Sequence, residues 1–180
     1  MDVAAVGKAE KARWLILIYN LPREPSRHRV AVWRKLKSLG AIYLQDGAAA
    51  LPEDAVTREQ LEWLQLRVRE AGGRATLWEA LPNTVAENRE LVEAFRAARE
   101  EGYGEVIEGA ERIRRKAALG ADRASLLEEI AKLEREFRAE RRRDYFRSPL
   151  RTEAAQALRA ARRMVVEGGT SADRRAAEGS

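Results

Sequence analysis

Residues 41–51 carry the sequence AIYLQDGAAAL, in which Asp46-Gly47 separates two short apolar runs. This dipeptide is favoured at the centre of a two-residue hairpin turn, because both central residues of that turn adopt positive φ angles. The stretch therefore predicts two antiparallel strands, over residues 41–45 and 48–51. A turn this tight makes the two strands neighbours in a sheet. The other elements are expected before and after this hairpin in the chain.

A strand and a helix are expected before the hairpin. Residues 14–19, WLILIY, are continuously apolar, which is typical of a central strand that is covered on at least one face. Ser26 is suited to cap a helix, and Gly40 is suited to end it. The apolar positions of this helix repeat on one side and are Val32, Trp33, Leu36 and Leu39.

A second helix and a fourth strand are expected after the hairpin. Thr57 and Gln60 have the spacing of a helix capping box, and the glycine pair at 72–73 ends the helix. We expect the fourth strand over residues 75–79. The order βαββαβ predicts an α+β domain over residues 13–81, with a ferredoxin-like antiparallel sheet and two helices on one face.

The rest of the chain has helical patterns and almost no strand signal. Thr84 and Glu87 have capping-box spacing, and we expect an all-helical region of four helices over residues 82–168. At the two ends we expect a flexible arm, residues 1–12, and a disordered tail, residues 169–180. The helix boundaries are expected at Gly102, at Gly120, at Ser148-Pro149 and at Gly168-Gly169.

Composition excludes several kinds of chemistry. The 180 residues include no cysteine and one histidine, His28, so disulfides, thiolate metal sites and histidine-built catalytic centres are not expected. No phosphate-loop, dinucleotide-binding, serine-elbow or zincin motif is present. We therefore expect a protein that is not an enzyme, with no catalytic residues, metal site or cofactor. The apolar run at 14–19 is too short to span a bilayer and no secretory signal precedes it, so we expect a cytoplasmic protein with no membrane partner.

The formal net charge of +5 is compatible with an anionic partner. One basic cluster surrounds the helix expected after Ser26. Free N–H groups at a helix N-terminus, with arginines beside them, can hold an oxyanion or a DNA phosphate. The alternative is a solvated basic face with Trp33 in the core. The candidate residues are Arg23, Arg27, Arg29, Arg34 and Lys35.

A second basic cluster lies further along the chain. Arg135, Arg138 and Arg142 are three and four residues apart, so on a helix they form one ridge that can follow DNA phosphates. Acidic residues alternate with this ridge, and ion pairs with them can neutralise it. These acidic residues are Glu134, Glu136 and Glu140.

Short pieces in a fixed order carry a family resemblance. They are WLILI at 14–18, RV at 29–30, VWRKL at 32–36, LGA at 39–41, Gly47, LP at 51–52, GG at 72–73, FR at 95–96, Tyr103, DYF at 144–146 and SP at 148–149. With this order and spacing the chain resembles the N-terminal domain of ChrB, the family of chromate-resistance regulators, over about residues 13–166. We expect the family's usual C-terminal domain to be absent from this chain.

The resemblance implies a cytoplasmic protein that senses chromate and binds the promoter DNA of the chromate-efflux operon. Chromate is a tetrahedral dianion, which suits arginines and a helix N-terminus. The absence of cysteine argues against sensing by thiol oxidation. The basic residues around Ser26 are the expected chromate contacts.

Two other functions remain open. An interaction module could form a homodimer through its open sheet edge or its helical half, with the arginines serving solubility. A metal-dependent nuclease of the Cas2 type would place an aspartate at the end of its first strand. Here that strand ends in Tyr19-Asn20, which ranks the nuclease last.

Overall fold

The computed structural model describes the backbone of residues 12–178 and the side chains of residues 12–167. The chain divides into two compact units, one up to Arg96 and one from Ala97. The division falls inside a helix rather than at residue 81. In chain order the elements are the strand β1 (Trp14–Asn20), the helix α2 (Arg27–Leu39), the strands β2 (Ile42–Gln45) and β3 (Ala48–Pro52), the helix α3 (Ala55–Glu70), the strand β4 (Arg74–Ala80) and the helices α4 (Val85–Ala118), α5 (Arg123–Arg142) and α6 (Leu150–Glu178).

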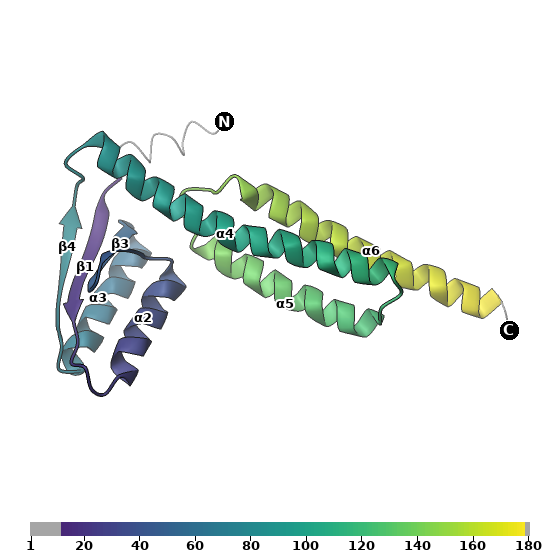
Figure 1. The fold of residues 1–180 in the computed structure, drawn as a ribbon, viewed down its shortest axis with the longest axis horizontal. Coiled ribbons are helices and arrows are strands. Elements are labelled where there is room, and N and C mark those ends of the chain that lie inside the picture. The colour runs from purple at the N-terminus through teal and green to yellow at the C-terminus, as the bar shows by residue number, and fades with distance from the viewer. Residues whose placement is uncertain (1–11, 179–180) are drawn as a thin grey trace. The chain divides into compact units, whose positions relative to one another are not determined.

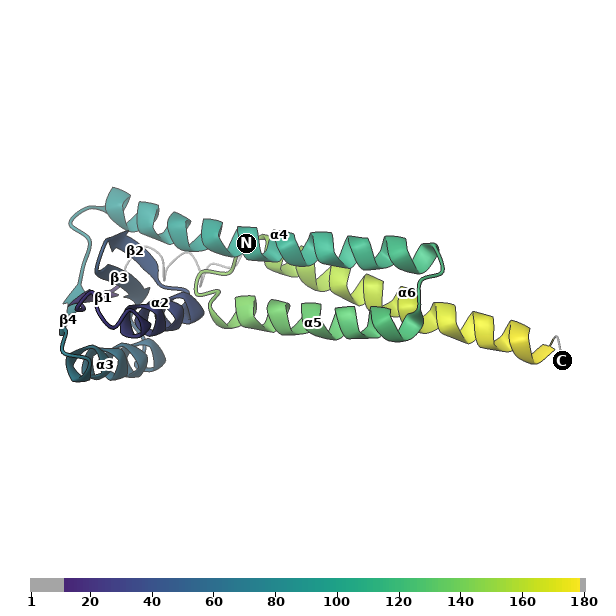
Figure 2. The ribbon, with the colours of Figure 1, turned by 60° about the horizontal axis from the view of Figure 1, so that its bottom comes forward.

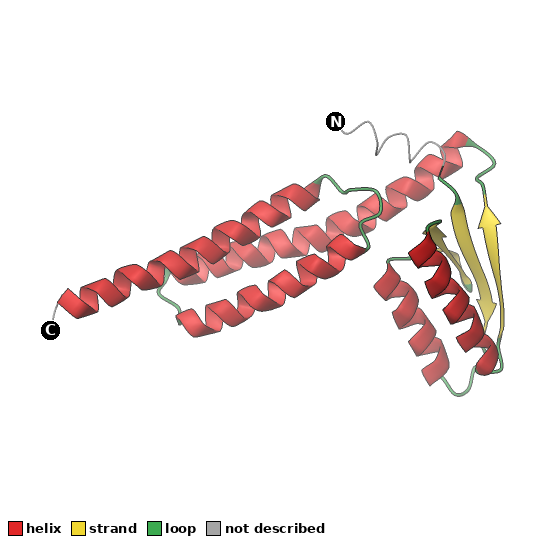
Figure 3. Ribbon diagram, turned by 180° about the vertical axis from the view of Figure 1, so that it is seen from behind, coloured by secondary structure: helices red, strands yellow, loops and turns green. Residues whose placement is uncertain are grey.

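The first unit is built on an antiparallel sheet with the strand order β2-β3-β1-β4. The central strand β1 pairs with β3 on one side and β4 on the other. Helices α2 and α3 cover the same face of the sheet (Figure 1; Figure 3). The expected antiparallel sheet and the mixture of strands and helices are therefore confirmed. The β2–β3 turn lies at Asp46-Gly47 as expected, but only Gly47 has a positive φ, of 76°, so the turn is not the expected type with two positive φ angles.

The two faces of the sheet differ in how they are covered. Leu15 and Leu17 of β1 lie on the face under the helices and are fully buried. On the other face, Ile18 is half-exposed, and Trp78 of β4, the partner of Ile16, is 57% exposed. Alternation along a strand places Ile16, Ile18, Thr76 and Trp78 on this side, which we call the open sheet face.

One end of that side is closed by the first turns of α4. The Trp14 indole Nε1 donates a hydrogen bond to Asn88 Oδ1 at 3.0 Å. Its ring stacks on Phe95 with the ring centres 5.4 Å apart. All three side chains are buried. The expected capping box starts this helix, because Thr84 N donates to Glu87 Oε2 and Glu87 N donates to Thr84 Oγ1.

Two helix starts differ from the expectation. Asp54, not Thr57, caps α3: the Thr57 amide donates to Asp54 Oδ1 at 2.8 Å, and Thr57 Oγ1 accepts from the Asp54 amide. The capping box therefore begins one turn earlier, and Thr57 is buried and bonded to the Pro52 carbonyl. Ser26 precedes α2 but makes no side-chain capping bond, while Gly40 ends that helix at a φ of 74°, as expected.

In the second unit, α5, α6 and the part of α4 from Ala97 lie side by side (Figure 1; Figure 2). Each helix contributes apolar side chains at helical spacing to one core. No helix within residues 12–178 is long and apolar enough to cross a membrane. The buried core residues include Tyr103, Val106, Ile113, Leu126, Ile130, Leu133, Leu158 and Val165.

Two expected helix ends are wrong. α4 runs unbroken through Gly102, where the absence of a Cβ leaves room for Glu140 of α5. A Cβ added at Gly102 would lie 2.4 Å from the Glu140 Cδ. α6 continues through Gly168 and Gly169 to Glu178, since a glycine costs a helix only about 1 kcal/mol. Of the arm expected over residues 1–12, all but the buried Ala12 lies outside the described residues.

A charged group is buried near Gly102. The Arg99 Nη1 donates to Glu140 Oε2 at 2.9 Å, and each of the two residues is only 8% exposed. Arg143 also pairs with Glu140. Burial lowers the pKa of Arg99, and the neighbouring Glu140 carboxylate opposes that shift. Among residues 12–167 nothing accepts a hydrogen bond from Arg99 Nε, so Glu140 is the main compensation for the buried charge.

A second buried carboxylate organises the turn before α6. The Tyr103 hydroxyl donates to Asp144 Oδ2 at 3.0 Å, and the Ser148 amide donates to Asp144 Oδ1 at 2.9 Å. Burial, followed by the negative charge of Asp144, raises the pKa of Tyr103 above its ordinary value. The hydroxyl therefore stays protonated and remains a donor to Asp144.

Candidate nucleic-acid interface

The helix α2 carries positive charge along its length and contains no acidic residue. Val32 and Leu36 are its buried positions, so most of its charged side chains lie on exposed sides. Among the side chains of residues 12–167, none forms an ion pair with Arg27, Arg29, Arg34 or Lys35. Such unneutralised charge on one element is typical of a surface that binds an anionic partner. The cations are Arg27, Arg29, Arg34, Lys35 and Lys37.

One side of α2 faces α3. The Lys35 Nζ lies 5.6 Å from the centre of the Trp63 ring, which fixes the side of α2 nearest α3. Arg27 and Arg34 are two helical turns apart and share one stripe, on the solvent side of Lys35. The fold thus brings three of the expected oxyanion residues onto one surface.

The other two expected oxyanion residues lie elsewhere. Arg29 is two positions after Arg27, about 200° around the helix, and therefore projects from the opposite flank. Arg23 is exposed in the turn between β1 and α2. The first turn of α2 holds no acidic residue, which leaves the positive end of the helix dipole uncompensated by its own side chains.

Trp33 does not lie in the core, contrary to the expectation that it shares the buried face of α2. It is 47% exposed, and the Lys37 Nζ lies 5.1 Å from its ring centre. Adjacent helix positions are about 100° apart. Because Val32 and Leu36 face the sheet, Trp33 is turned onto the flank of the helix.

Trp63 and Arg67 also belong to this surface, although they were not predicted from the sequence. Trp63 is 49% exposed on α3, and the Arg67 Cζ lies 5.5 Å from its ring centre. One signal was present: residue 63 lies off the helical face defined by Leu61, Leu64 and Val68. A large aromatic residue on a polar side of a helix is a candidate contact residue.

The second expected phosphate-binding cluster lies in the second unit. Its members Arg135, Arg138 and Arg142 are exposed on α5. Glu134 forms two ion pairs: its Oε2 lies 3.8 Å from the Arg138 Nη1, and its Oε1 lies 2.6 Å from the Nη1 of Arg162 on α6. The ridge is therefore partly neutralised, whereas Arg27, Arg29, Arg34 and Lys35 of α2 have no ion pair among the side chains of residues 12–167.

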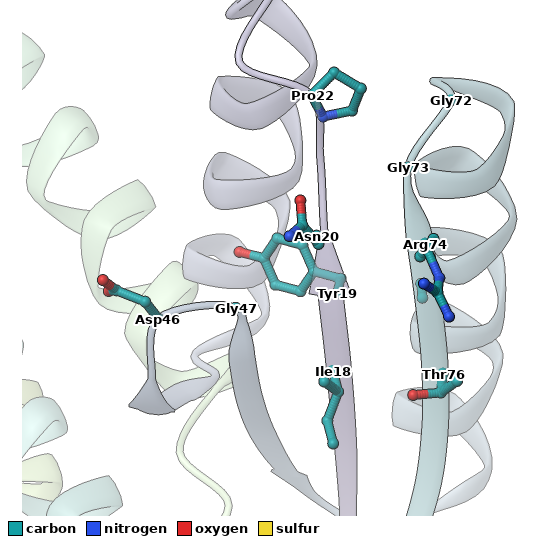
Figure 4. Close-up of a pocket in the computed structure, with 11 residues that line it drawn as sticks. Ile18, Tyr19, Asn20, Pro22, Asp46, Gly47, Gly72, Gly73, Arg74 and Thr76 are labelled. Atoms are coloured by element: carbon teal, nitrogen blue, oxygen red, sulfur yellow. The ribbon is translucent and has the colours of Figure 1, made fainter.

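A cavity of about 620 Å³ lies where β1 ends, beside the β2–β3 turn (Figure 4). It contains one carboxylate, Asp46, together with Asn20 and Arg74. Among the described residues, no group of three or more acidic, histidine or cysteine side chains could hold a metal ion. Nearby, partial burial and a hydrogen bond to Tyr19 raise the pKa of Tyr43. This cavity offers the Cas2-type alternative no cluster of metal ligands.

The fold and this surface define a mixed α/β protein with a basic, tryptophan-bearing helical layer, followed by a helical unit. The family model described as "Protein ChrB, N-terminal" matches residues 29–170, so the chain belongs to the ChrB N-terminal family. It is 38% identical over 60 residues to Protein ChrB of Cupriavidus metallidurans. That stretch is 33% of this chain and 18% of the relative. No solved structure matches the chain significantly.

Proposed function

We propose that the chain is a DNA-binding, oxyanion-responsive module of a chromate-resistance regulator, without enzymatic activity. Membership of the ChrB N-terminal family suggests the regulatory role in chromate resistance. The observation that carries DNA binding is the acid-free positive surface of α2, on which Arg27, Arg34 and Lys35 have no ion pair among the side chains of residues 12–167. We also interpret the first unit as ferredoxin-like, which its βαββαβ order and the sheet order β2-β3-β1-β4 support.

The proposed contacts are made to phosphates. Arg27 and Arg34 are seven residues apart, a rise of roughly 10 Å along the helix. Duplex DNA carries one negative charge per roughly 1.7 Å of its axis, so these two side chains and Lys35 can each reach a phosphate. Phosphate contacts supply affinity and orientation rather than base readout.

Replacing Arg27, Arg34 and Lys35 together by alanine is expected to reduce the salt dependence of DNA binding. Each lost phosphate contact lowers the slope of log K against log salt by about 1, so the triple variant should lose about 3. The measurement is fluorescence anisotropy with a duplex from upstream of the gene, over a series of salt concentrations.

The matched control replaces the ridge residues Arg135, Arg138 and Arg142 by alanine. Because Glu134 already neutralises part of that ridge, this variant should retain most of the slope. A wild-type slope in the α2 variant would contradict the proposal. A larger loss in the ridge variant would instead assign the DNA contacts to α5.

The oxyanion part of the proposal uses the start of α2. Arg23 and Arg27 flank a helix N-terminus that has no acidic side chain in its first turn. Since Arg27 also belongs to the phosphate-binding stripe, chromate and DNA compete for it. Chromate should therefore release the duplex at constant ionic strength, while sulfate at the same concentration should not. Equal release by both anions would show a salt effect without sensing.

A second candidate function is a homodimeric interaction module, which the open sheet face favours. Ile18 and Trp78 expose large apolar surfaces there, and such patches commonly mark interaction sites. If a second copy covers this face, Trp78→Glu should convert a dimer to a monomer, because dimerisation would bury an unpaired charge. Sedimentation equilibrium measures this change. A wild-type protein that stays monomeric at high concentration excludes this candidate.

A further inference from the structure

Trp63 has an environment that its role in folding does not explain. Its helix α3 buries Leu61, Leu64 and Val68, whereas Trp63 remains half-exposed. Two cations from different helices approach its ring, Lys35 at 5.6 Å and Arg67 at 5.5 Å. A cation at this distance is attracted to the electron-rich face of the ring.

The charges around Trp63 belong to the surface already described. Lys35 and its neighbour Arg34 have no ion pair among residues 12–167. The Arg67 Nη1 lies 3.1 Å from the Glu70 Oε2, and this ion pair between exposed side chains is a contact of small energy. An accessible aromatic ring bordered by cations is the combination found at sites for single-stranded nucleic acid, where a base stacks on the ring and the cations contact phosphates.

We propose that Trp63, Lys35, Arg34 and Arg67 form a binding site for unpaired DNA, in which one base stacks on Trp63. The inference rests on the proposed function in taking DNA as the ligand. It differs in the form of DNA, because the faces of paired bases are occupied by their neighbours inside a duplex and cannot stack on a side chain. On binding, the long side chains of Lys35 and Arg67 move from the ring to the phosphates on either side of the stacked base.

The test compares Trp63→Leu with the matched control Trp78→Leu. Both tryptophans are about half-exposed, but Trp78 lies on the open sheet face, away from α2 and α3. Affinities are measured by fluorescence anisotropy for a thymidine oligonucleotide and for the promoter duplex. Trp63→Leu is expected to bind the oligonucleotide about 5- to 100-fold more weakly, with duplex affinity within about twofold of wild type. Trp78→Leu keeps an apolar side chain on the open sheet face, so it should preserve any contact made there and leave both affinities within about twofold of wild type.

Three further measurements distinguish this result from a folding defect and from a pure charge effect. Trp63→Phe, which keeps a smaller ring, should show an intermediate affinity and the wild-type circular dichroism spectrum. The oligonucleotide should quench tryptophan emission in the wild type and in Trp78→Leu, and should fail to do so in Trp63→Leu. Polyglutamate should compete poorly with the oligonucleotide, because it offers no base to stack.

The outcomes separate this inference from the proposed function. The inference is overturned if wild type does not bind the oligonucleotide, if Trp63→Leu binds it like wild type, or if polyglutamate competes equally well. Duplex binding with the expected salt slope would still support the proposed function in each case. Conversely, oligonucleotide binding that depends on Trp63, without any duplex binding, would support this site and contradict the promoter-binding proposal.

Discussion

The Glu140→Gln variant is expected to lose about 3–5 kcal/mol of its free energy of unfolding. Glu140 is the carboxylate that faces the buried guanidinium of Arg99, and Arg143 also pairs with it. Glutamine keeps the shape but removes the negative charge, so Arg99 stays buried as an uncompensated cation. Urea unfolding followed by the helical circular dichroism signal measures the loss.

A matched control comes from the same unit. Glu129 pairs with Lys116 at 2.7 Å, but both side chains are well exposed. Glu129→Gln should therefore change the free energy of unfolding by no more than about 1 kcal/mol. Replacing Arg99 and Glu140 together by leucine should restore much of the stability lost in Glu140→Gln, because no unpaired charge is then buried. Equal effects of Glu140→Gln and Glu129→Gln would contradict this account of the buried pair.

Trp14→Ala is expected to destabilise the first unit by about 3–5 kcal/mol. The substitution removes a fully buried ring that stacks on Phe95, and it leaves a cavity between β1 and α4. It also removes the donor to Asn88 Oδ1, which is itself buried. Chemical unfolding monitored by the emission of the remaining tryptophans measures the change.

Two other variants divide this effect into its parts. Trp14→Phe keeps a stacked ring and loses the indole N–H, so it should cost about 1–3 kcal/mol, the range for a buried acceptor left without its donor. Trp78→Ala removes a ring that is half-exposed and should have a much smaller effect. If Trp14→Ala and Trp78→Ala prove equally destabilising, the first turns of α4 do not anchor the sheet as described.

The features that the sequence predicted correctly depend on residues close together in the chain. The Asp46-Gly47 turn, the Gly40 helix end and the Thr84–Glu87 capping box each involve a few neighbouring residues. Local signals therefore gave the number and order of the elements in the first unit.

The errors arose where the deciding partner is distant or where two neighbours compete. Gly102 is compatible with a helix end in the sequence, and only the approach of Glu140 explains why a glycine stands inside the continuous helix α4. Trp33 is apolar like Val32, but a helix cannot turn both fully towards the sheet. At the start of α3, Asp54 rather than Thr57 is the cap, because a carboxylate makes a stronger hydrogen bond to a backbone amide than a hydroxyl does.

The candidate site was predicted only in part for a related reason. The basic residues of α2 lie close together in the chain, so inspection of the sequence finds them. Trp63 and Arg67 belong to another helix, and their position beside Lys35 is created by the way α2 and α3 share one face of the sheet. Such a surface is visible only after the fold is known.

The helix α4 has a consequence for the choice of fragments to express. Its first turns supply Asn88 and Phe95 to Trp14 in the first unit, whereas Arg99 and Tyr103, which follow directly, belong to the second. A fragment that stops at residue 81, where the strands end, would expose the Trp14 ring to water and invite aggregation. Gene truncations meant to isolate the sheet should therefore extend at least to Arg96, and a protease site for separating the units should not be placed before it.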